Sequence, residues 1–331
     1  MGFAKLYIEP TSACNLNCSM CFRKNWIDEK IGFMTDATFD RVIKGISDAE
    51  SLESVMFGGM GEPLLHGNIA EMIRSFSVHK IKTELITNAT MLTKQTADRL
   101  AETGLDTLWV SVDGFERSAY EKIQKGSDFD LIINNIKYFN KVRKNCKTGM
   151  SFVIMDNNID ELVKINGFAD ELSFDFINLS YAVPSAPLKI TDSCYDTGFC
   201  TGKNKRVDFS TFNFRRLNYC PFAEGDNCFV KWNGDVTACM QLLHSSYSYL
   251  YEEKRKITAK SFGNVNREAL NDIWESGEFT RFRERVKKFE FPDCTVCDGC
   301  DDRLENRADC MYNEFPTCGA CLWAQGVGRC P

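Results

Sequence analysis

The sequence predicts an α/β fold: a partial (β/α)6 barrel of the TIM type, followed by a smaller cysteine-rich domain. Short apolar segments alternate with amphipathic segments as far as Pro184, as expected for parallel strands joined by helical crossovers. Cysteines then become frequent, since ten of the sixteen in the chain lie from Cys220 onward. These two patterns together predict the fold class.

Predicted strands and helices alternate along the barrel. The strands are short apolar or alternating runs at residues 3–9, 55–57, 83–87, 107–112, 150–155 and 176–181. The helices carry apolar side chains at helical spacing and cover residues 36–47, 69–76, 94–102, 131–142 and 159–168. In such barrels functional residues lie at the carboxyl ends of the strands. We therefore expect the polar and glycine-rich segments that follow the strands to form the active site.

The composition divides the chain into three parts. Residues 1–184 form the predicted barrel, and residues 185–219, rich in Ser, Thr, Asp, Asn and Lys, are predicted to be a linker or irregular region. Residues 220–331 form the predicted cysteine-rich domain, with one helix at 268–288. This domain has few apolar runs, so we expect bound metal to stabilise it.

Composition also restricts the partners and the compartment. The chain has 331 residues, 44% hydrophobic and 26% charged, and a net charge of −6 without a long basic run, which argues against nucleic acid as a partner. No apolar run approaches the roughly 20 residues that span a bilayer, and no signal peptide is evident. A cytoplasmic location is therefore expected. Clustered cysteines in a reducing compartment favour metal binding over disulfides, and the chain has only three histidines.

The most informative segment is residues 9–23, which places three cysteines in a CxxxCxxC pattern: Cys14, Cys18 and Cys21. Three neighbouring thiolates can hold a four-iron cluster and leave one iron without a protein ligand. An open coordination position allows a metal site to bind and act on a small molecule. Half of a zinc site and the start of a disulfide framework are the alternatives, and the spacing favours the cluster.

This pattern resembles the radical S-adenosylmethionine (SAM) enzymes. In that family one electron from a [4Fe-4S] cluster cleaves SAM to a 5′-deoxyadenosyl radical, which abstracts hydrogen from a substrate. The segment GGMGEP after the second predicted strand is similar to the family's GGEP, with Met60 inserted. The resemblance implies SAM-binding roles at successive strand ends for Gly59, Gly61, Glu62, Asn88, Ser111, Asp113 and Asn158.

Each of these polar residues taken singly fits a helix cap or a turn. Their order after CxxxCxxC makes coincidence improbable. Two positions depart from the family pattern: Ala89 replaces a glycine, and Met20 stands where an aromatic residue often packs near adenine.

The C-terminal region resembles the SPASM extension, which binds one or two auxiliary [4Fe-4S] clusters. The resemblance implies one cluster on Cys220, Cys228, Cys239 and Cys321, and a second on Cys297, Cys300, Cys318 and Cys330. Cys294 and Cys310 are then surplus, although Cys294 can exchange roles with Cys300, and zinc can replace one cluster. Met240 stands where SPASM enzymes that oxidise serine or cysteine carry an Asp, which weakens a sulfatase-maturase interpretation.

A narrower resemblance concerns the segments CFRKNWID, VMFGGMGEPLLH and EFPTCGACLWAQGVGRCP. They are similar to radical SAM/SPASM maturases of tungsten-cofactor oxidoreductases related to aldehyde ferredoxin oxidoreductase. The sequence thus predicts an enzyme that modifies a protein or peptide and takes electrons from ferredoxin or flavodoxin. A maturase of a ribosomally made peptide natural product and a non-catalytic zinc- or cluster-binding scaffold are the alternatives.

Overall fold

The computed structural model describes residues 2–46, 51–181, 207–208, 218–250, 252–297 and 299–325. The barrel strands are β1 (Lys5–Ile8), β2 (Ser54–Phe57), β3 (Lys82–Thr87), β4 (Thr107–Ser111), β5 (Lys147–Ile154) and β6 (Phe176–Tyr181). The helices between them are α1 (Asp36–Ile46), α2 (Ile69–Ser77), α3 (Lys94–Ala101), α4 (Arg117–Ile123), α5 (Phe129–Val142) and α6 (Ile165–Glu171). Short 3-10 helices are η1 (Phe22–Asn25), η2 (Pro63–Leu65) and η3 (Ile159–Lys164).

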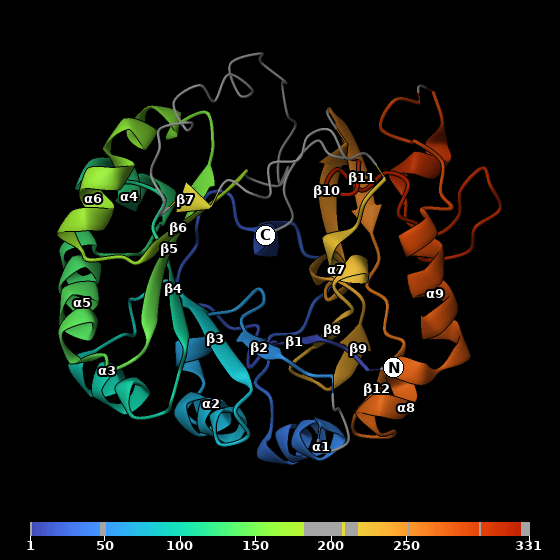
Figure 1. Cartoon of the computed structure of the whole chain (residues 1–331). Helices are drawn as coiled ribbons and strands as arrows, with labels where there is room; N and C mark the ends of the chain where they lie inside the picture. Colours follow the sequence, from blue (N-terminus) through green and yellow to red (C-terminus); the bar gives the residue numbers. More distant parts are fainter. Residues whose placement is uncertain are drawn as a thin grey trace.

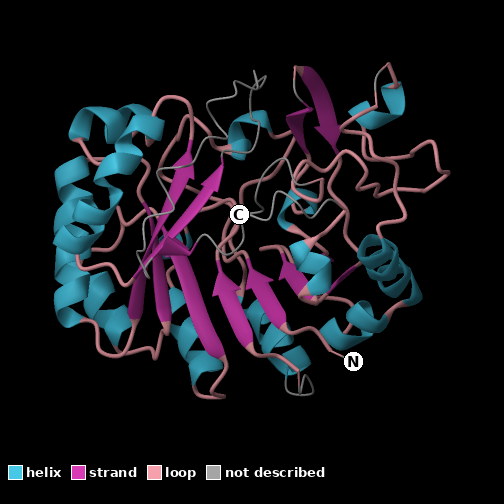
Figure 2. Cartoon of the chain, turned by 45° about the horizontal axis from the view of Figure 1, so that its top comes forward, coloured by secondary structure: helices cyan, strands magenta, loops and turns pink. Residues whose placement is uncertain are grey.

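Strands β1 to β6 pair in sequence order and all run parallel, which confirms the predicted α/β architecture. The helices lie on the outer side of the curved sheet, and the strands point to one edge (Figures 1 and 2). Alternating burial along β1 and β2 explains their formation, because Leu6, Ile8, Val55 and Phe57 all face the core. Side-chain caps from Thr93 and Asp128 begin α3 and α5.

The C-terminal region contributes strands to the same sheet. Its described elements are α7 (Pro221–Glu224), β8 (Asn227–Val230), β9 (Asp235–Thr237), η6 (Met240–Leu242), β10 (Ser246–Leu250), β11 (Glu253–Ile257), β12 (Gly263–Asn264), α8 (Leu270–Glu275), α9 (Gly277–Lys288) and η7 (Asp301–Leu304). Strand β8 pairs in parallel with β1, and β9 and β12 continue the sheet beyond it. A separate pair, β10 and β11, forms an antiparallel hairpin.

Ten of the described strands thus form one sheet, with β12 and the short β7 (Val207–Asp208) at the two ends of its strand order. The C-terminal region shares the barrel's core, because Val230, Ile273 and Trp274 belong to the same buried cluster as Phe3 and Leu6. The Phe3 and Trp274 rings meet edge to face at 5.6 Å between centroids. This shared core was not expected from a region with so few apolar runs.

Three helices differ from the prediction. Helix α4 was not predicted, because seven residues show too little periodicity. The helix expected at 159–168 begins as η3 and becomes α6 only at Ile165. The helix expected at 268–288 is two helices, interrupted at Ser276, whose extended backbone (ψ 144°) ends α8 and whose side chain caps α9.

The boundary predicted at Pro184 and most of residues 185–219 lie outside the described residues, so the division into domains stays a prediction. Across the described ranges, no helix has the length and apolar character needed to cross a membrane.

Candidate active site and cluster-binding thiols

The cysteine loop follows β1 directly and is held by hydrogen bonds on two sides. Thr11 Oγ1 donates to the Gly32 carbonyl at 2.7 Å and accepts from the Ala13 amide at 3.0 Å. Farther along, the Asn17 and Ser19 amides donate to the Lys125 and Ile123 carbonyls at the end of α4. The loop is therefore fixed on the carboxyl edge of the sheet, as predicted from its position after a strand.

The structure brings the three thiols of this loop into one electrostatic neighbourhood. Burial, followed by the Cys21 thiol, raises the pKa of Cys18 to about 12, and Asp113 and Cys14 contribute in the same direction. Burial also raises the pKa of Cys14. Mutually repelling thiolates favour a shared cation, and a metal centre deprotonates the thiols that bind it. Their half-buried positions suit a cluster that must meet a soluble cofactor.

The glycine segment after β2 lies against the cysteine loop. A Cβ atom on Gly61 would fall 2.1 Å from the Thr11 carbonyl oxygen and 2.6 Å from that of Ala13, so a side chain is excluded there. The next amide, that of Glu62, donates to the Ala13 carbonyl at 2.7 Å. Gly59 has a φ of +119°, which glycine adopts most easily. Glycine therefore lets this segment approach the backbone of the cysteine loop closely, whereas the role of Gly59 and Gly61 in cofactor binding stays a prediction.

Glu62 lies buried between the ends of β2 and β3, with 2% exposure. Its Oε1 accepts from Leu64 N at 3.0 Å and Thr87 Oγ1 at 2.7 Å, and its Oε2 accepts from Asn88 N at 2.8 Å. Burial raises the pKa of this carboxyl, and the three hydrogen bonds oppose the shift. The side chain therefore joins the segment after β2 to the segment after β3.

The segment after β3 also contacts the cysteine loop. Asn88 Nδ2 donates to Asn15 Oδ1 at 3.2 Å and lies 3.9 Å from Cys14 Sγ, while its Oδ1 accepts from Thr90 Oγ1 at 2.6 Å. Ala89, which replaces the family's glycine, has a φ of +60° and is fully buried. The backbone thus keeps the left-handed conformation although the residue is alanine.

The ends of β4 and β5 are joined by a buried amide and carboxylate network. Asp113 Oδ1 accepts from Val153 N at 2.8 Å, and Asn158 Nδ2 donates to the Asp113 and Val153 carbonyls. Gln124 was missed by the sequence analysis; its Nε2 donates to Asp113 Oδ2 at 2.8 Å and to Ser111 Oγ at 3.2 Å. Burial raises the pKa of Asp113 to about 6 against these hydrogen bonds.

A second network missed by the sequence analysis connects the cysteine loop with the C-terminal region. His244 Nε2 lies 2.9 Å from Glu9 Oε1, and His244 Nδ1 lies 2.9 Å from Glu29 Oε2. Lys231 Nζ donates to the same Glu29 oxygen at 2.9 Å, and the Trp26 ring stacks on His244 at 4.3 Å. A histidine between two carboxylates is favoured in its doubly protonated form, in which both nitrogens donate.

This network reaches the glycine segment, because Glu9 Oε1 also accepts from Met60 N at 3.0 Å. Burial lowers the pKa of His244, but hydrogen bonds to Glu29 and Glu9 outweigh it, so the net shift is upward. Burial likewise opposes the hydrogen bonds that lower the pKa of Glu29 to about 2. The buried charges compensate one another beside the candidate active site.

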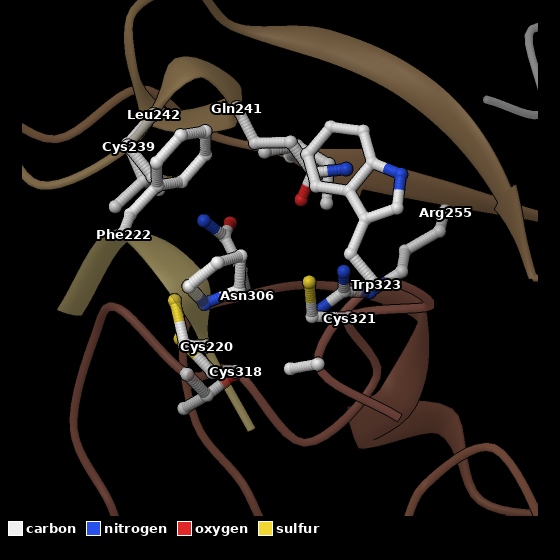
Figure 3. Close-up of a pocket in the computed structure, with 14 residues that line it drawn as sticks. Cys220, Phe222, Cys239, Gln241, Leu242, Arg255, Asn306, Cys318, Cys321 and Trp323 are labelled. Carbon is white, nitrogen blue, oxygen red and sulfur yellow. The ribbon is translucent and has the colours of Figure 1, made fainter. Parts of the chain in front are cut away.

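Four C-terminal thiols line one cavity, shown in Figure 3: Cys220, Cys239, Cys318 and Cys321. The cavity encloses about 50 Å³, more than a single water molecule needs. Burial, followed by the Cys321 thiol, raises the pKa of Cys220 to about 11. Burial and then the neighbouring thiols also raise the pKa values of Cys239 and Cys318. A set of four thiols is suited to an iron–sulfur cluster or to zinc.

This grouping differs from the one implied by the sequence resemblance. Cys318 takes the place expected for Cys228, which lies fully buried in the hydrophobic core with Arg283 as its charged neighbour. Cys294 has Cys310 and Cys297 as its thiol neighbours, and Cys300 precedes η7. Cys294 and Cys310, which the resemblance left surplus, therefore lie near Cys297, whereas Cys330 lies outside the described residues.

Among the described residues, no three His, Cys, Asp or Glu side chains are placed to hold one metal ion. The four-thiol cavity and the three-thiol loop nevertheless have the ligand chemistry of iron–sulfur sites.

Sequence comparisons identify relatives over both parts of the chain. The Radical SAM superfamily matches residues 8–169, and SPASM, an iron-sulfur cluster-binding domain, matches residues 220–301. The tungsten-containing aldehyde ferredoxin oxidoreductase cofactor-modifying protein of Pyrococcus furiosus is 30% identical over 348 residues, which cover 98% of this chain and 96% of that protein. A probable GTP 3′,8-cyclase of Pyrococcus horikoshii is 31% identical over 168 residues, covering 51% and 53% of the two chains.

Solved structures share the fold. SuiB of Streptococcus suis bound to S-adenosylmethionine has a TM-score of 0.66 at 20% identity, with 90% of this chain and 71% of that chain covered. Native anSMEcpe with bound AdoMet has a TM-score of 0.62 at 19% identity, with 89% of this chain and 87% of that chain covered. The shared fold includes the C-terminal region as well as the barrel.

The family match supplies the cofactors. They are SAM, a [4Fe-4S] cluster and auxiliary iron–sulfur clusters in the C-terminal region. The thiols of the cysteine loop and of the cavity described above have the chemistry that these clusters require. The scaffold alternative is set aside, because the relatives are enzymes and maturases. The chain belongs to the radical SAM superfamily and is a radical SAM enzyme with a C-terminal SPASM domain.

Proposed function

We propose that Cys14, Cys18 and Cys21 hold the catalytic cluster and that the strand ends around them bind SAM. When bound and reduced, this cluster supplies the electron that cleaves SAM to methionine and a 5′-deoxyadenosyl radical. The observation that carries the proposal is the placement of the CxxxCxxC loop against the glycine segment, where Glu62 N donates to the Ala13 carbonyl. The remaining residues of the site bind, orient or shield the cofactor.

The site residues divide into two roles in this proposal. The backbone of Gly59 and Gly61 and the half-exposed side chains of Asn88 and Ser111 face the cofactor. Glu62, Asp113 and Asn158 are positioning residues, since they are buried and accept or donate hydrogen bonds within the protein. Their side-chain hydrogen bonds hold the backbone of adjacent strand ends at fixed separation, which orients the groups that contact SAM.

We further propose that the substrate is a tungsten-containing aldehyde ferredoxin oxidoreductase-like enzyme, its cofactor or an associated peptide. The support is the relative of Pyrococcus furiosus, whose similarity extends over almost the whole of both chains. A ribosomally made peptide is the second candidate, because SuiB bound to the precursor peptide SuiA has the same fold, with a TM-score of 0.64. Ferredoxin or flavodoxin is the proposed electron donor.

The test is production of 5′-deoxyadenosine, measured by mass spectrometry after anaerobic reconstitution with iron and sulfide and addition of SAM and dithionite. We expect product from the wild type and a loss to the background level in Cys18→Ala. Cys146→Ala is the matched control. Cys146 is a buried thiol just before β5, and its charged neighbours are an arginine and two carboxylates. Product from Cys18→Ala at the wild-type rate would contradict the assignment of the catalytic cluster.

The substrate is tested with candidates that carry deuterium at carbon positions that do not exchange with water. Each candidate, the tungsten enzyme with its cofactor and a peptide encoded beside it, is added separately. The true substrate is expected to raise the yield of 5′-deoxyadenosine and to transfer deuterium to it. A candidate that changes neither quantity is excluded.

A further inference from the structure

A buried arginine lies beside the four-thiol cavity. Arg255 belongs to β11, is 4% exposed, and lines the cavity together with Cys220, Cys318 and Cys321. Figure 3 shows its side chain on the Cys321 and Trp323 side of the cavity. Its Nε donates to the Arg303 carbonyl at 2.9 Å. The guanidinium stays protonated in proteins, so a full positive charge is buried here.

That charge needs an anion. Within the described residues, no ion pair joins Arg255 to a carboxylate, and the charged neighbours that favour its protonated form are three thiols: Cys321, Cys318 and Cys294. Burial lowers the pKa of the guanidinium, and those three thiols act in the opposite direction. A buried cation without an anionic partner is strongly unfavourable. The thiols that line the cavity with Arg255 would supply this anion as thiolates when they bind metal.

Arg283 gives a comparison within the same region. It is also partly buried and neighbours Cys228, but Asp226 and Glu284 contribute to its environment and its guanidinium lies over the Trp274 ring at 3.6 Å. Arg255 has thiols from both groups around it, the cavity set and Cys294, whereas Arg283 has a single thiol. The two arginines thus differ in whether a thiol cluster compensates their charge.

We propose that Arg255 is the buried counter-charge of the C-terminal iron–sulfur site and stabilises the anionic cluster held by Cys220, Cys239, Cys318 and Cys321. A positive charge beside the cluster favours the reduced form, which has gained one electron and no proton, and so raises the reduction potential. Charge and hydrogen bonds around cluster sulfurs set potentials in this way. The proposal rests on the proposed function, because it requires a cluster at the C-terminal thiols.

The experiment uses the full chain carrying Cys14→Ala, Cys18→Ala and Cys21→Ala, so that iron remains only at the C-terminal thiols. After anaerobic reconstitution, we measure the reduction potential by dithionite titration followed by electron paramagnetic resonance, and iron release to a chelator. The variants are Arg255→Gln, which keeps a donor for the Arg303 carbonyl without charge, and Arg255→Lys, which keeps the charge. Arg283→Gln is the control.

We expect Arg255→Gln to have a more negative potential and to release iron about 10- to 100-fold faster than the parent. Arg255→Lys should remain close to the parent in potential, because it retains the charge, and Arg283→Gln should match the parent in both measurements. An arginine with only a structural role would make the Lys and Gln variants equally different from the parent. Equal potentials and release rates in Arg255→Gln and the parent would overturn the proposal.

Failure of the proposed function gives a different result. If the parent takes up zinc and no iron or sulfide, the auxiliary-cluster claim fails, while zinc release from the same variants still tests the counter-charge. Faster zinc release from Arg255→Gln alone would then support the counter-charge at a zinc site. Circular dichroism melts of the metal-free chains show whether each variant folds. If Arg255→Gln does not fold, a reduction potential of Arg255→Lys that departs from that of the parent would overturn the proposal.

Discussion

Ala89 has a left-handed backbone at a position where its relatives are expected to have glycine. A Cβ atom in that conformation costs about 1–2 kcal/mol, but Ala89 is fully buried, and burying one methyl group contributes roughly 0.8 kcal/mol. The two terms are of similar size. The strand end therefore keeps its conformation without glycine.

Ala89→Gly tests this balance. We expect a change of less than about 1 kcal/mol in the free energy of unfolding, because relief of the left-handed strain offsets the lost methyl contact. Ala97→Gly, in the buried face of α3, should lower that free energy by about 1–2 kcal/mol. The variant loses a buried methyl group, and glycine loses more conformational entropy than alanine when the helix forms. Urea unfolding of the reconstituted proteins measures both. Equal destabilisation of the two variants would contradict the account of Ala89.

At this scale the sequence predicted that these polar residues follow successive strands, but not what holds their side chains. Glu62, Asn88, Asp113 and Asn158 lie at successive strand ends, as expected. Gln124 was not predicted, because the sequence at the end of a helix does not show that a glutamine side chain contacts Asp113. Such a role depends on how two strand ends meet in three dimensions.

At the scale of elements, the cysteine loop and the glycine segment fit together through their backbones. Gly61 cannot carry a side chain, because the nearest atoms are carbonyl oxygens of the loop and cannot move aside as a flexible side chain would. The contact is therefore expected to be as important for cofactor binding as the thiols.

Gly61→Ala tests the contact. We expect the variant to weaken SAM binding by at least about tenfold and to lower the melting temperature, because the segment must withdraw from the cysteine loop. Gly67→Ala is the matched control, since a Cβ atom there would meet nothing within 4 Å. Equilibrium dialysis of reconstituted protein with SAM gives the affinities. Wild-type affinity in Gly61→Ala would contradict the backbone account.

The elements themselves were largely predictable from periodicity, and the failures have physical reasons. The strand–helix alternation from β1 to β6 was recognised, because apolar and amphipathic runs alternate clearly. Helix α4 was missed although its end holds the cysteine loop, since seven residues carry little pattern. Strand β8 was missed because its pairing with β1, more than 200 residues earlier in the chain, leaves no local signal.

At the scale of the whole molecule, the C-terminal region is joined to the catalytic edge by buried charges. His244 and Lys231 come from that region, whereas Glu9 directly follows β1 and Glu29 follows η1. Both His244 partners are more than 200 residues away in sequence. No sequence pattern could have shown the network, because its members come together only when β8 pairs with β1.

Glu29→Gln tests the network through its pH dependence. The folded pKa of Glu29, about 2, is below its ordinary value of 4.5, so its stabilising contribution is present above about pH 4.5 and is lost as the pH falls toward 2. We expect the variant to be less stable by about 3 kcal/mol at pH 6, because removing one partner leaves buried charge unpaired. The deficit should shrink at pH 3.

The pKa of His244 is raised in the folded protein, in the opposite direction to that of Glu29. Its contribution to stability is therefore present below about pH 6.5 and declines as the pH rises through the raised folded pKa. The Glu29→Gln deficit should therefore also shrink at high pH. Glu102→Gln, which breaks an exposed pair with Lys144, is the control and should change little at any pH. A deficit that does not vary with pH would contradict the charge network.

The proposed cluster assignment gives the N-terminal thiols the cluster that meets SAM and gives the C-terminal thiols separate clusters. The measurement is electron paramagnetic resonance of dithionite-reduced protein with and without SAM, paired with iron and sulfide content. We predict about eight to twelve irons in the wild type, about four fewer in Cys18→Ala, and a SAM-dependent change in the spectrum only in the wild type. A spectrum that SAM leaves unchanged, or a Cys18→Ala spectrum that responds as the wild type does, would contradict it.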